Sequence, residues 1–534
     1  MKYPLLLTAI WLLLVLIVNP MGNFPLNDDW QYAYPVKQWI ETGQLSMQGR
    51  FAPNIIGQVI WGYLSCFPFG IFDFSYLRIG VLFIGGATIV LFYHWLKEQG
   101  IPDKSNFLIS LSLLLSPLFF NLSFSFMTDV PFLFLMLLSL KYFFSYVEQE
   151  SLISLGIASA AALGAYLIRQ PGLLLLPAYA VFLCFQKQHQ RNRWLMVGLL
   201  FTLSVSTYVG LEQGIKPALG IAEHYIPVSH LYFSSLFERP ATVLFTWFAR
   251  FLKTFIYLGI FALPLLPFLV GQMRKSKFFK WPYLGALLFG NLLLLGLLHA
   301  VGKTFPFGGN IWFNWGLGPE LLKDVYTLGL PNTPKTGPIL LYIIQYMGQM
   351  SISLISLLII KCWNDLSSAK KGLYLGLILF NLLYLAVISI FSYFDRYILL
   401  CITSLFFLLA PWFNVPASPK LGLYLLPFLC MGYFSIFGTK DYLNWNRARL
   451  EAFQWLQEEG ITITQIDAGY EYNGWYNYHE DAVQEEGQSF WWVTSDEYLI
   501  TFGPVEKYSS IQSFPYYRYL WWKKDKLFVL QQER

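Results

Sequence analysis

The sequence predicts an all-α polytopic membrane bundle of about thirteen transmembrane helices, followed by a small C-terminal α/β extramembrane domain. Hydrophobic residues fill 56% of the 534 positions and charged residues only 13%, whereas soluble proteins have about 25% charged residues. Long apolar runs recur up to residue 437 and then stop. Because such a chain hides most of its surface in lipid, we expect an integral membrane protein.

The apolar runs are identified by length, because a spanning helix needs about 20 largely apolar residues. Lys2 alone precedes the first run, and Asn19–Gly22 lacks the small residues of a cleavage site. We therefore expect an uncleaved anchor rather than a removed signal peptide. The predicted spans are 4–19, 75–96, 107–124, 130–147, 152–169, 171–186, 194–212, 251–272, 281–300, 338–360, 372–392, 397–413 and 420–437.

Basic residues in the short loops predict the orientation, because cytoplasmic loops carry an excess of Lys and Arg. With the N-terminus inside, Lys97 and Lys104 share one cytoplasmic loop, and Lys370 and Lys371 share another. Segment 54–70 must then lie along the outer face without crossing. It contains prolines and glycines and is rich in Trp and Tyr, as interfacial helices are.

Four polar features fall on the outer side in this topology. A charged side chain at mid-bilayer costs roughly 2.5–3.5 kcal/mol, so charges in membrane proteins retreat to interfaces or cavities. A catalytic cavity at a membrane interface requires that its polar residues lie on the same side of the membrane, as these four features do. The four features are Asp28–Asp29, Met127–Pro131, Arg169–Gly172 and Asp395–Tyr397.

The tail, residues 438–534, is predicted to form a separate α/β domain on the non-cytoplasmic side, leaving 1–437 as the membrane domain. We expect a helix that begins near Asp441 and runs to about Glu459, with Gly460 as its stop. A tail of this length lies within the size range of an independent domain. Strands are expected at 461–467, 498–502, 509–514 and 527–530.

Three acidic residues at span ends, Asp28, Asp29 and Asp129, are candidate catalytic residues. In sugar transfer from a lipid carrier, a carboxylate would take the proton of the acceptor hydroxyl, and positioned bases contribute typically 10²–10⁴-fold. The alternative role is helix capping, because Asp satisfies free backbone N–H groups and Pro131 is typical of a helix start. If a divalent metal ion is used, Asp28 and Asp129 are its expected ligands.

The order and spacing of these motifs resemble those of GT-C glycosyltransferases, with protein O-mannosyltransferases and bacterial lipid A aminoarabinose transferases as the nearest branches. Asn27–Tyr32 resembles their first acidic motif, and Met127–Pro131 resembles their second. The resemblance covers residues 1 to about 410 and implies a polyprenyl-phosphate-linked donor, with Asp28 as the base. Two features depart from it: the second acid is Asp29 rather than Glu, and Arg50–Pro53 stands where relatives often have Lys-Pro-Pro.

Cations are needed to receive the departing phosphate, and planar guanidinium groups suit phosphate oxygens. Arg169 has the alternative of a snorkelling residue at the interface, and Arg396 that of a surface ion pair with Asp395. His224 lies in an outer loop, but its six-residue spacing from His230 is no zinc signature. The candidate phosphate- or sugar-binding residues are Arg50, Arg169, Arg396, Tyr397 and His224.

These features predict a glycosyltransferase that moves a hexosyl or pentosyl group from a polyprenyl-phosphate donor to a glycan, lipid or protein acceptor. The expected reaction is a single inverting displacement on the periplasmic or extracellular side, in a bacterial inner membrane, without a nucleic-acid partner. No P-loop, Rossmann glycine pattern or Gly-x-Ser-x-Gly motif is present, so an activated lipid is favoured over ATP as energy source. A transporter or lipid flippase, which would show inverted repeats and midplane acids, and a non-catalytic scaffold are the alternatives.

Overall fold

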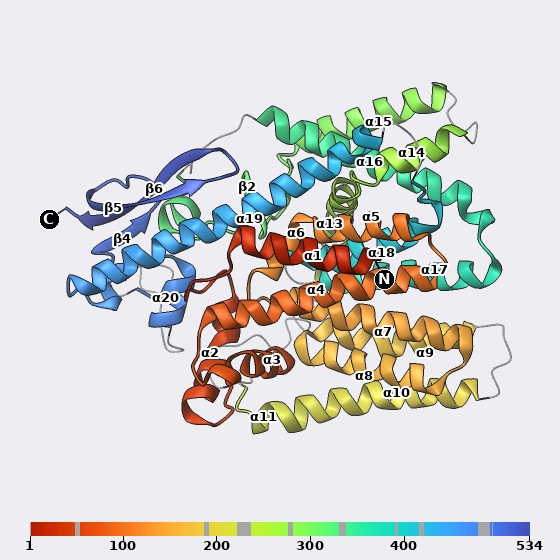
Figure 1. The fold of residues 1–534 in the computed structure, drawn as a ribbon, viewed down its shortest axis with the longest axis horizontal. Coiled ribbons are helices and arrows are strands. Elements are labelled where there is room, and N and C mark those ends of the chain that lie inside the picture. Colours follow the sequence, from red (N-terminus) through yellow and green to blue (C-terminus); the bar gives the residue numbers. More distant parts are fainter. Residues whose placement is uncertain are drawn as a thin grey trace.

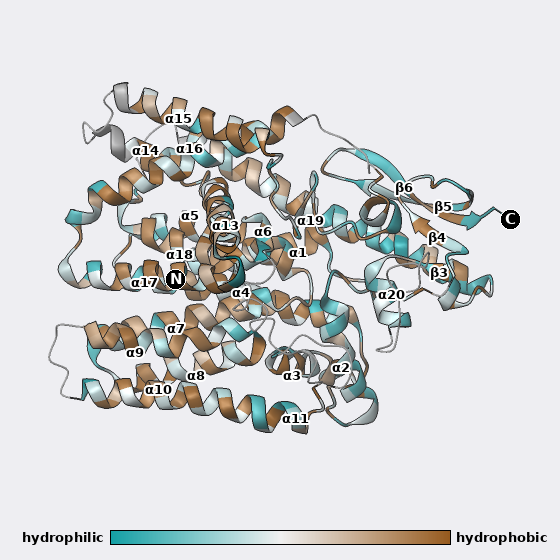
Figure 2. Ribbon diagram, turned by 180° about the vertical axis from the view of Figure 1, so that it is seen from behind, coloured by the Kyte–Doolittle hydropathy of each residue, from teal (hydrophilic) through white to brown (hydrophobic). Residues whose placement is uncertain are grey.

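Helices lying side by side make up most of the chain, and a small sheet domain lies at one end of them (Figure 1). The computed structural model describes residues 2–47, 54–185, 192–221, 237–275, 281–330, 338–389, 393–415, 421–478, 492–493 and 495–533. Figure 2 shows hydrophobic residues over the long helices and hydrophilic residues gathered toward the sheet domain. This division follows the composition change that the sequence shows at the start of the tail.

Each predicted span corresponds to a helix or a pair of helices. The first ten helices are α1 (Lys2–Val18), α2 (Asp29–Thr42), α3 (Ile56–Cys66), α4 (Phe74–Glu98), α5 (Asp103–Leu114), α6 (Pro117–Ser123), α7 (Asp129–Gln149), α8 (Leu152–Ile168), α9 (Leu175–Phe185) and α10 (Arg193–Val209). The later helices are α11 (Lys216–Ala218), α13 (Pro240–Phe261), α14 (Leu266–Lys275), α15 (Trp281–Ala300), α16 (Pro338–Cys362), α17 (Ser368–Ile388), α18 (Leu399–Leu409), α19 (Leu421–Glu458) and α20 (Tyr470–Asn477).

Within the described residues, eight helices are long and apolar enough to cross a membrane. A ninth is added if α5 and α6, which meet at an angle of 64°, form one broken span. Four shorter apolar helices of 10–17 residues occupy the remaining predicted spans. The polytopic helical bundle is therefore confirmed, whereas the count of thirteen crossings is not.

The segment predicted to lie along the membrane face forms α3, an 11-residue helix followed by a 3₁₀ turn over Phe67–Phe69. Crossing the hydrocarbon core takes about 20 helical residues, so α3 is too short to span. It packs against α2, α4 and α8. Several of its apolar side chains, such as Ile60 and Leu64, are exposed.

The helix expected to begin near Asp441 in fact begins twenty residues earlier, and this prediction was wrong. Helix α19 runs without a break from Leu421 to Glu458, so Asp441 lies in its interior and the expected domain boundary falls within one helix. A glycine costs about 1 kcal/mol inside a helix and does not break it. Gly438 instead allows close packing, because a Cβ there would meet Leu317 at 3.1 Å.

The sheet of the C-terminal part has the strand order β3-β4-β6-β5 and packs on α19. Its strands are β3 (Ile466–Asp467), β4 (Tyr498–Thr501), β5 (Tyr508–Arg518) and β6 (Lys523–Gln532). Strand β3 pairs with β4 in parallel, and the other pairs are antiparallel. The predicted strand 461–467 is reduced to β3, because Thr462 and Gln465 form a capping box around a 3₁₀ turn before it.

One hydrophobic core joins the two parts, since the same cluster of buried side chains includes Leu7 of α1, Leu456 of α19 and Val529 of β6. The loop between α15 and α16 contributes a short hairpin, β1 (Trp312–Phe313) and β2 (Gly316–Leu317). Strand β2 also packs on α19. The sheet domain is thereby fixed against the end of the bundle where α2 begins (Figure 1).

Candidate active site

A tight turn before α2 presents Asp28. Asn27 adopts a left-handed conformation with φ of 52°, which asparagine tolerates better than most residues. Asp28 occupies the N-cap position of α2, yet its side chain makes no capping hydrogen bond. The carboxylate is thus available to other partners.

Both oxygens of Asp28 accept hydrogen bonds from distant parts of the chain. Arg396 donates from Nη2 to Oδ2 at 2.8 Å, and the hydroxyl of Tyr470 donates to Oδ1 at 3.2 Å. Arg396 lies in a 3₁₀ turn (Asp395–Ile398) that leads into α18, and its side chain is only 6% exposed. The Asp28 side chain retains 24% exposure, so it remains accessible to a substrate.

Unlike Asp28, the Asp29 side chain is buried and binds backbone groups. Its Oδ1 accepts from the backbone N–H of Leu26 at 2.6 Å, and its Oδ2 accepts from the N–H of Phe126 at 3.2 Å. Burial raises the pKa of this carboxyl to about 7, an effect that the nearby Arg78 guanidinium opposes. Asp29 therefore ties the turn to the segment that precedes α7.

Asp129, the first residue of α7, forms an ion pair with Arg169. Arg169 lies between α8 and the 3₁₀ turn Gln170–Leu174. The other oxygen of Asp129 is buried and has no hydrogen-bond partner among the described residues. Thr128, not Asp129, is the N-cap residue of α7.

Tyr397 lies between the two acid–arginine pairs. Its ring centroid is 4.5 Å from the guanidinium carbon of Arg169 and 5.3 Å from that of Arg396. The face of an aromatic ring attracts a guanidinium group at such a distance. Asp28 and Asp129 are therefore joined through their arginines to one aromatic side chain.

A cavity of about 420 Å³ adjoins these residues. Arg169, Arg396 and Tyr397 form part of its wall, with Tyr32 and Thr128 beside them. The remaining wall residues are Ile55, Ile168, Gln170, Pro171, Leu173, Leu174, Pro177, Ser204, Val387 and Ile388. The cavity thus combines two guanidinium groups with an otherwise mostly apolar lining.

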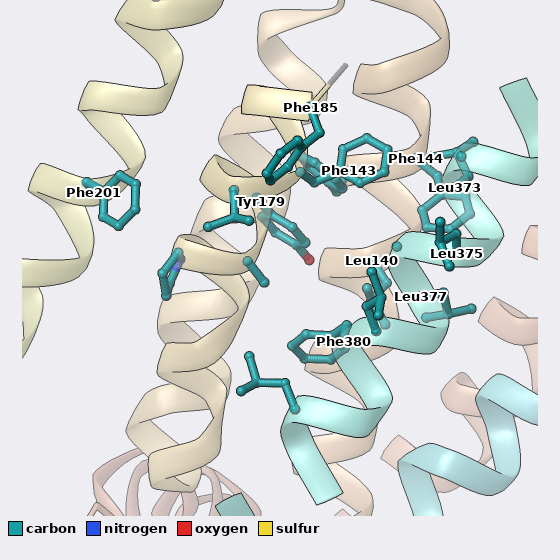
Figure 3. Close-up of a pocket in the computed structure, with 18 residues that line it drawn as sticks. Leu140, Phe143, Phe144, Tyr179, Phe185, Phe201, Leu373, Leu375, Leu377 and Phe380 are labelled. Atoms are coloured by element: carbon teal, nitrogen blue, oxygen red, sulfur yellow. The ribbon is translucent and has the colours of Figure 1, made fainter. Parts of the chain in front are cut away.

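A second, apolar cavity of about 680 Å³ lies between α7, α9, α10 and α17. Figure 3 shows aromatic and leucine side chains reaching into it from these helices. The hydroxyl of Tyr179 is 2.7 Å from that of Ser139, so this polar atom is satisfied. Pro177 contributes to the walls of both cavities.

Asp395 does not form the surface ion pair with Arg396 that was the alternative for these neighbours. It is fully buried, and its carboxylate accepts hydrogen bonds from the backbone N–H groups of Asn310, Ile311 and Trp312. The side chain of Asn310 in turn accepts from Asn27 Nδ2 at 2.7 Å. Asp395 therefore holds the loop that buttresses the Asp28 turn.

The predicted roles of Arg50 and His224 and the binding of a divalent metal ion by Asp28 and Asp129 stay predictions. Arg50 and His224 lie outside the described residues. Among the residues that are described, no group of three or more His, Cys, Asp or Glu side chains is arranged to hold a metal ion. Asp28 and Asp129, the two acids considered as metal ligands, each bind an arginine.

Sequence reasoning assigned no role in the site to Tyr470, Gln31 or Asn310. Gln31 lies two residues after Asp29, and its Nε2 donates to the Tyr470 hydroxyl at 2.9 Å. Tyr470 lies in the tail, where no sequence pattern connects it with the first span. Only the packing of α20 on α2 brings the two together.

A family model described as dolichyl-phosphate-mannose-protein mannosyltransferase matches residues 60–209. Over these residues the match confirms the predicted resemblance to protein O-mannosyltransferases. The matching segment carries Asp129 and Arg169, whereas Asp28 and Arg396 lie outside it. With its long apolar helices, the chain is an integral multi-pass membrane protein.

Solved structures show low similarity. The S. cerevisiae protein O-mannosyltransferase Pmt1–Pmt2 complex bound to the sugar donor is 17% identical, with a TM-score of 0.29 over 42% of this chain and 34% of that chain. ArnT from Cupriavidus metallidurans bound to undecaprenyl phosphate is 14% identical, with a TM-score of 0.36 over 81% and 77% of the two chains. Archaeal oligosaccharyltransferase AglB from Archaeoglobus fulgidus is 14% identical, with a TM-score of 0.31 over 80% and 59%.

These TM-scores are too low to establish a shared fold. Among curated proteins, no sequence matches the chain significantly.

Proposed function

We propose that this chain transfers a sugar from a polyprenyl-phosphate donor to an acceptor hydroxyl on the non-cytoplasmic side of the membrane. The observation that carries the proposal is the partly exposed Asp28 carboxylate, held by Arg396 beside a cavity that also presents Arg169. A base and two phosphate-binding cations are what such a reaction requires. The family match over residues 60–209 supports the class of donor.

In the proposed reaction, Asp28 takes the proton of the acceptor hydroxyl as its oxygen attacks the anomeric carbon. The bond from that carbon to the phosphate oxygen breaks, and the lipid phosphate leaves with the electron pair. Arg169 and Arg396 stabilise the departing phosphate, since guanidinium groups make strong charge-assisted hydrogen bonds with it. One displacement of this kind inverts the anomeric configuration.

The lipid tail of the donor would occupy the apolar cavity between α7, α9, α10 and α17 (Figure 3). Its position beside the cavity that contains the arginines, with Pro177 shared by both, supports this assignment. Each buried CH₂ group contributes about 0.8 kcal/mol. A long isoprenoid chain would thus anchor the donor while its phosphate reaches Arg169 and Arg396.

The proposal is tested with the full-length protein in proteoliposomes, a radiolabelled polyprenyl-phosphate sugar and an extract that contains candidate acceptors. Asp28→Asn keeps the size of the side chain but removes the base, and transfer should fall by about 100-fold or more. Asp365→Asn, at an exposed position, is the matched control. Near-normal transfer by Asp28→Asn would exclude Asp28 as the base, and uptake of substrate by the wild type without any glycosidic product would favour transport.

A further inference from the structure

Helix α20 of the C-terminal domain lies directly against the turn that bears Asp28. The Tyr470 hydroxyl accepts a hydrogen bond from Gln31 Nε2 at 2.9 Å and donates to Asp28 Oδ1 at 3.2 Å. A phenol carries a single proton. Since Gln31 donates to the oxygen, that proton is directed toward the carboxylate.

A buried ion pair fixes α20 to the same turn. Glu471 and Arg449 have fully buried side chains and are 2.9 Å apart. Glu471 also accepts from the backbone N–H of Asn27 at 3.2 Å, and Arg449 donates to the carbonyl of Pro25. Because breaking such a pair leaves an uncompensated buried charge, α20 and the turn are held in one arrangement.

Close packing adds to this restraint. Trp30, two residues after Asp28, lies edge-on to Tyr470 with ring centroids 5.8 Å apart. A Cβ at Gly474 would approach the Trp30 ring to 2.4 Å, so only glycine allows this separation. The α20 backbone therefore rests on the residue beside the acidic pair.

The carboxylate of an aspartate needs such support, because rotation about its terminal sp³–sp² bond is broad. One hydrogen bond leaves the plane of the carboxylate poorly defined. Donors on both oxygens, Arg396 from the membrane bundle and Tyr470 from the C-terminal domain, define it.

We propose that Tyr470 is a positioning residue of the active site and that the C-terminal domain thereby completes it. This inference rests on the proposed function of Asp28 as the base. Tyr470 does not transfer a proton itself; it orients the oxygen that accepts one. The C-terminal domain then supplies a residue that the active site needs.

The test replaces Tyr470 with Phe in the full-length protein and measures transfer in proteoliposomes. We expect kcat to fall by about 10-fold, since misplaced reacting groups are costly, while the KM for the lipid donor changes little. Tyr472→Phe is the matched control: it lies on the same helix, and its hydroxyl is buried with no hydrogen-bond partner among the described residues. It should behave as the wild type.

A coupling measurement separates positioning from a merely structural role. Gln31→Met should lower kcat less than Tyr470→Phe, and the double variant should match Tyr470→Phe alone, because Gln31 acts through the tyrosine. Unchanged kcat in Tyr470→Phe, equal losses in Tyr472→Phe, or additive losses in the double variant would overturn the inference. If Asp28→Asn retains transfer, the role of Asp28 as the base is wrong, and the inference about Tyr470 falls with it. If Asp28→Asn is inactive but Tyr470→Phe transfers normally, only the inference about Tyr470 is wrong.

Discussion

Arg396 donates a hydrogen bond to Asp28 across 368 positions of the sequence, with 2.8 Å between Nη2 and Oδ2. The same guanidinium forms part of the wall of the cavity of about 420 Å³. One side chain is therefore placed to orient the proposed base and to meet the donor phosphate.

Arg396→Lys is expected to lower kcat/KM for transfer by roughly 10–100-fold. Lysine keeps the charge but loses the planar fork of N–H groups and the stacking on Tyr397. Initial rates in proteoliposomes measure the loss, with Arg193→Lys at the start of α10 as the control. A rate within twofold of the wild type would contradict a role for Arg396 in the site.

The buried carboxyl of Asp29 predicts a pH-dependent stability. Its pKa is about 7 in the folded protein and about 3.9 in an unfolded chain. Between these values the folded protein holds a proton that the unfolded chain has lost. The stability from this group is thus fully present below about pH 4 and is lost as the pH rises through about 7.

Asp29→Asn cannot titrate at this position, so it should remove this pH-dependent part of the free energy of unfolding. That part amounts to at most about 4 kcal/mol. Unfolding midpoints in detergent, recorded at one scan rate between pH 5 and pH 8, measure the difference between the two proteins. The variant should also be less stable at pH 5, because one backbone N–H loses its acceptor. Parallel curves for the two proteins would contradict the expectation.

Asp395→Ala is expected to destabilise the protein by about 3 kcal/mol or more, since it leaves three N–H groups of the 310–312 segment, two of them buried, without their acceptor. Transfer should fall as well, because that segment carries Asn310, which binds Asn27. Thermal unfolding and initial rates are compared with those of the exposed Asp365→Ala. A stable but inactive variant would show that the two effects are separate.

Arg449→Met should cost roughly 3–5 kcal/mol, because it leaves Glu471 buried without its cation. Limited proteolysis should then cut the C-terminal domain faster than in the wild type. Adding Glu471→Gln removes the unpaired charge and should restore part of the resistance. If the double variant is cleaved as fast as the single one, the buried charge is not the cause.

Ala178→Trp narrows the apolar cavity and should raise the KM for a long-chain donor about 10-fold. A donor with one or two isoprene units should be affected much less, because its tail does not reach the cavity. Leu292→Trp, at a position of α15 that is 57% exposed, is the control for a bulky side chain facing lipid. Equal effects on both donors would place the tail elsewhere.

The sequence allowed prediction of the features that depend on local pattern. Apolar runs located the helices, and Asp28 and Asp129 were expected at span ends because charge avoids the bilayer interior. The two acids are connected through Arg396 and Arg169 to one aromatic side chain, Tyr397, and the predicted shared side of the membrane could not establish this connection. Neither arginine partner could be chosen from the sequence, because each contact depends on how helices pack.

The C-terminal domain was the least predictable part. Tyr470 and Asp28 are 442 positions apart, and no periodicity links residues at such a distance. The continuity of α19 was missed, because the predicted span 420–437 and the helix expected from Asp441 form one helix. Asp441 instead accepts from the backbone N–H groups of Tyr519 and Leu520, a partnership that only the folded sheet provides.

The unbroken α19 has a mechanical consequence. Its 38 residues extend about 57 Å at 1.5 Å each, nearly twice the roughly 30 Å of the hydrocarbon layer. In a rigid helix of this length, a tilt of the lipid-embedded half also moves the other half. Helices tilt when the bilayer thins. The rate of the proposed transfer should therefore respond to the acyl-chain length of the surrounding lipid, with the bilayer acting on the proposed site through α19.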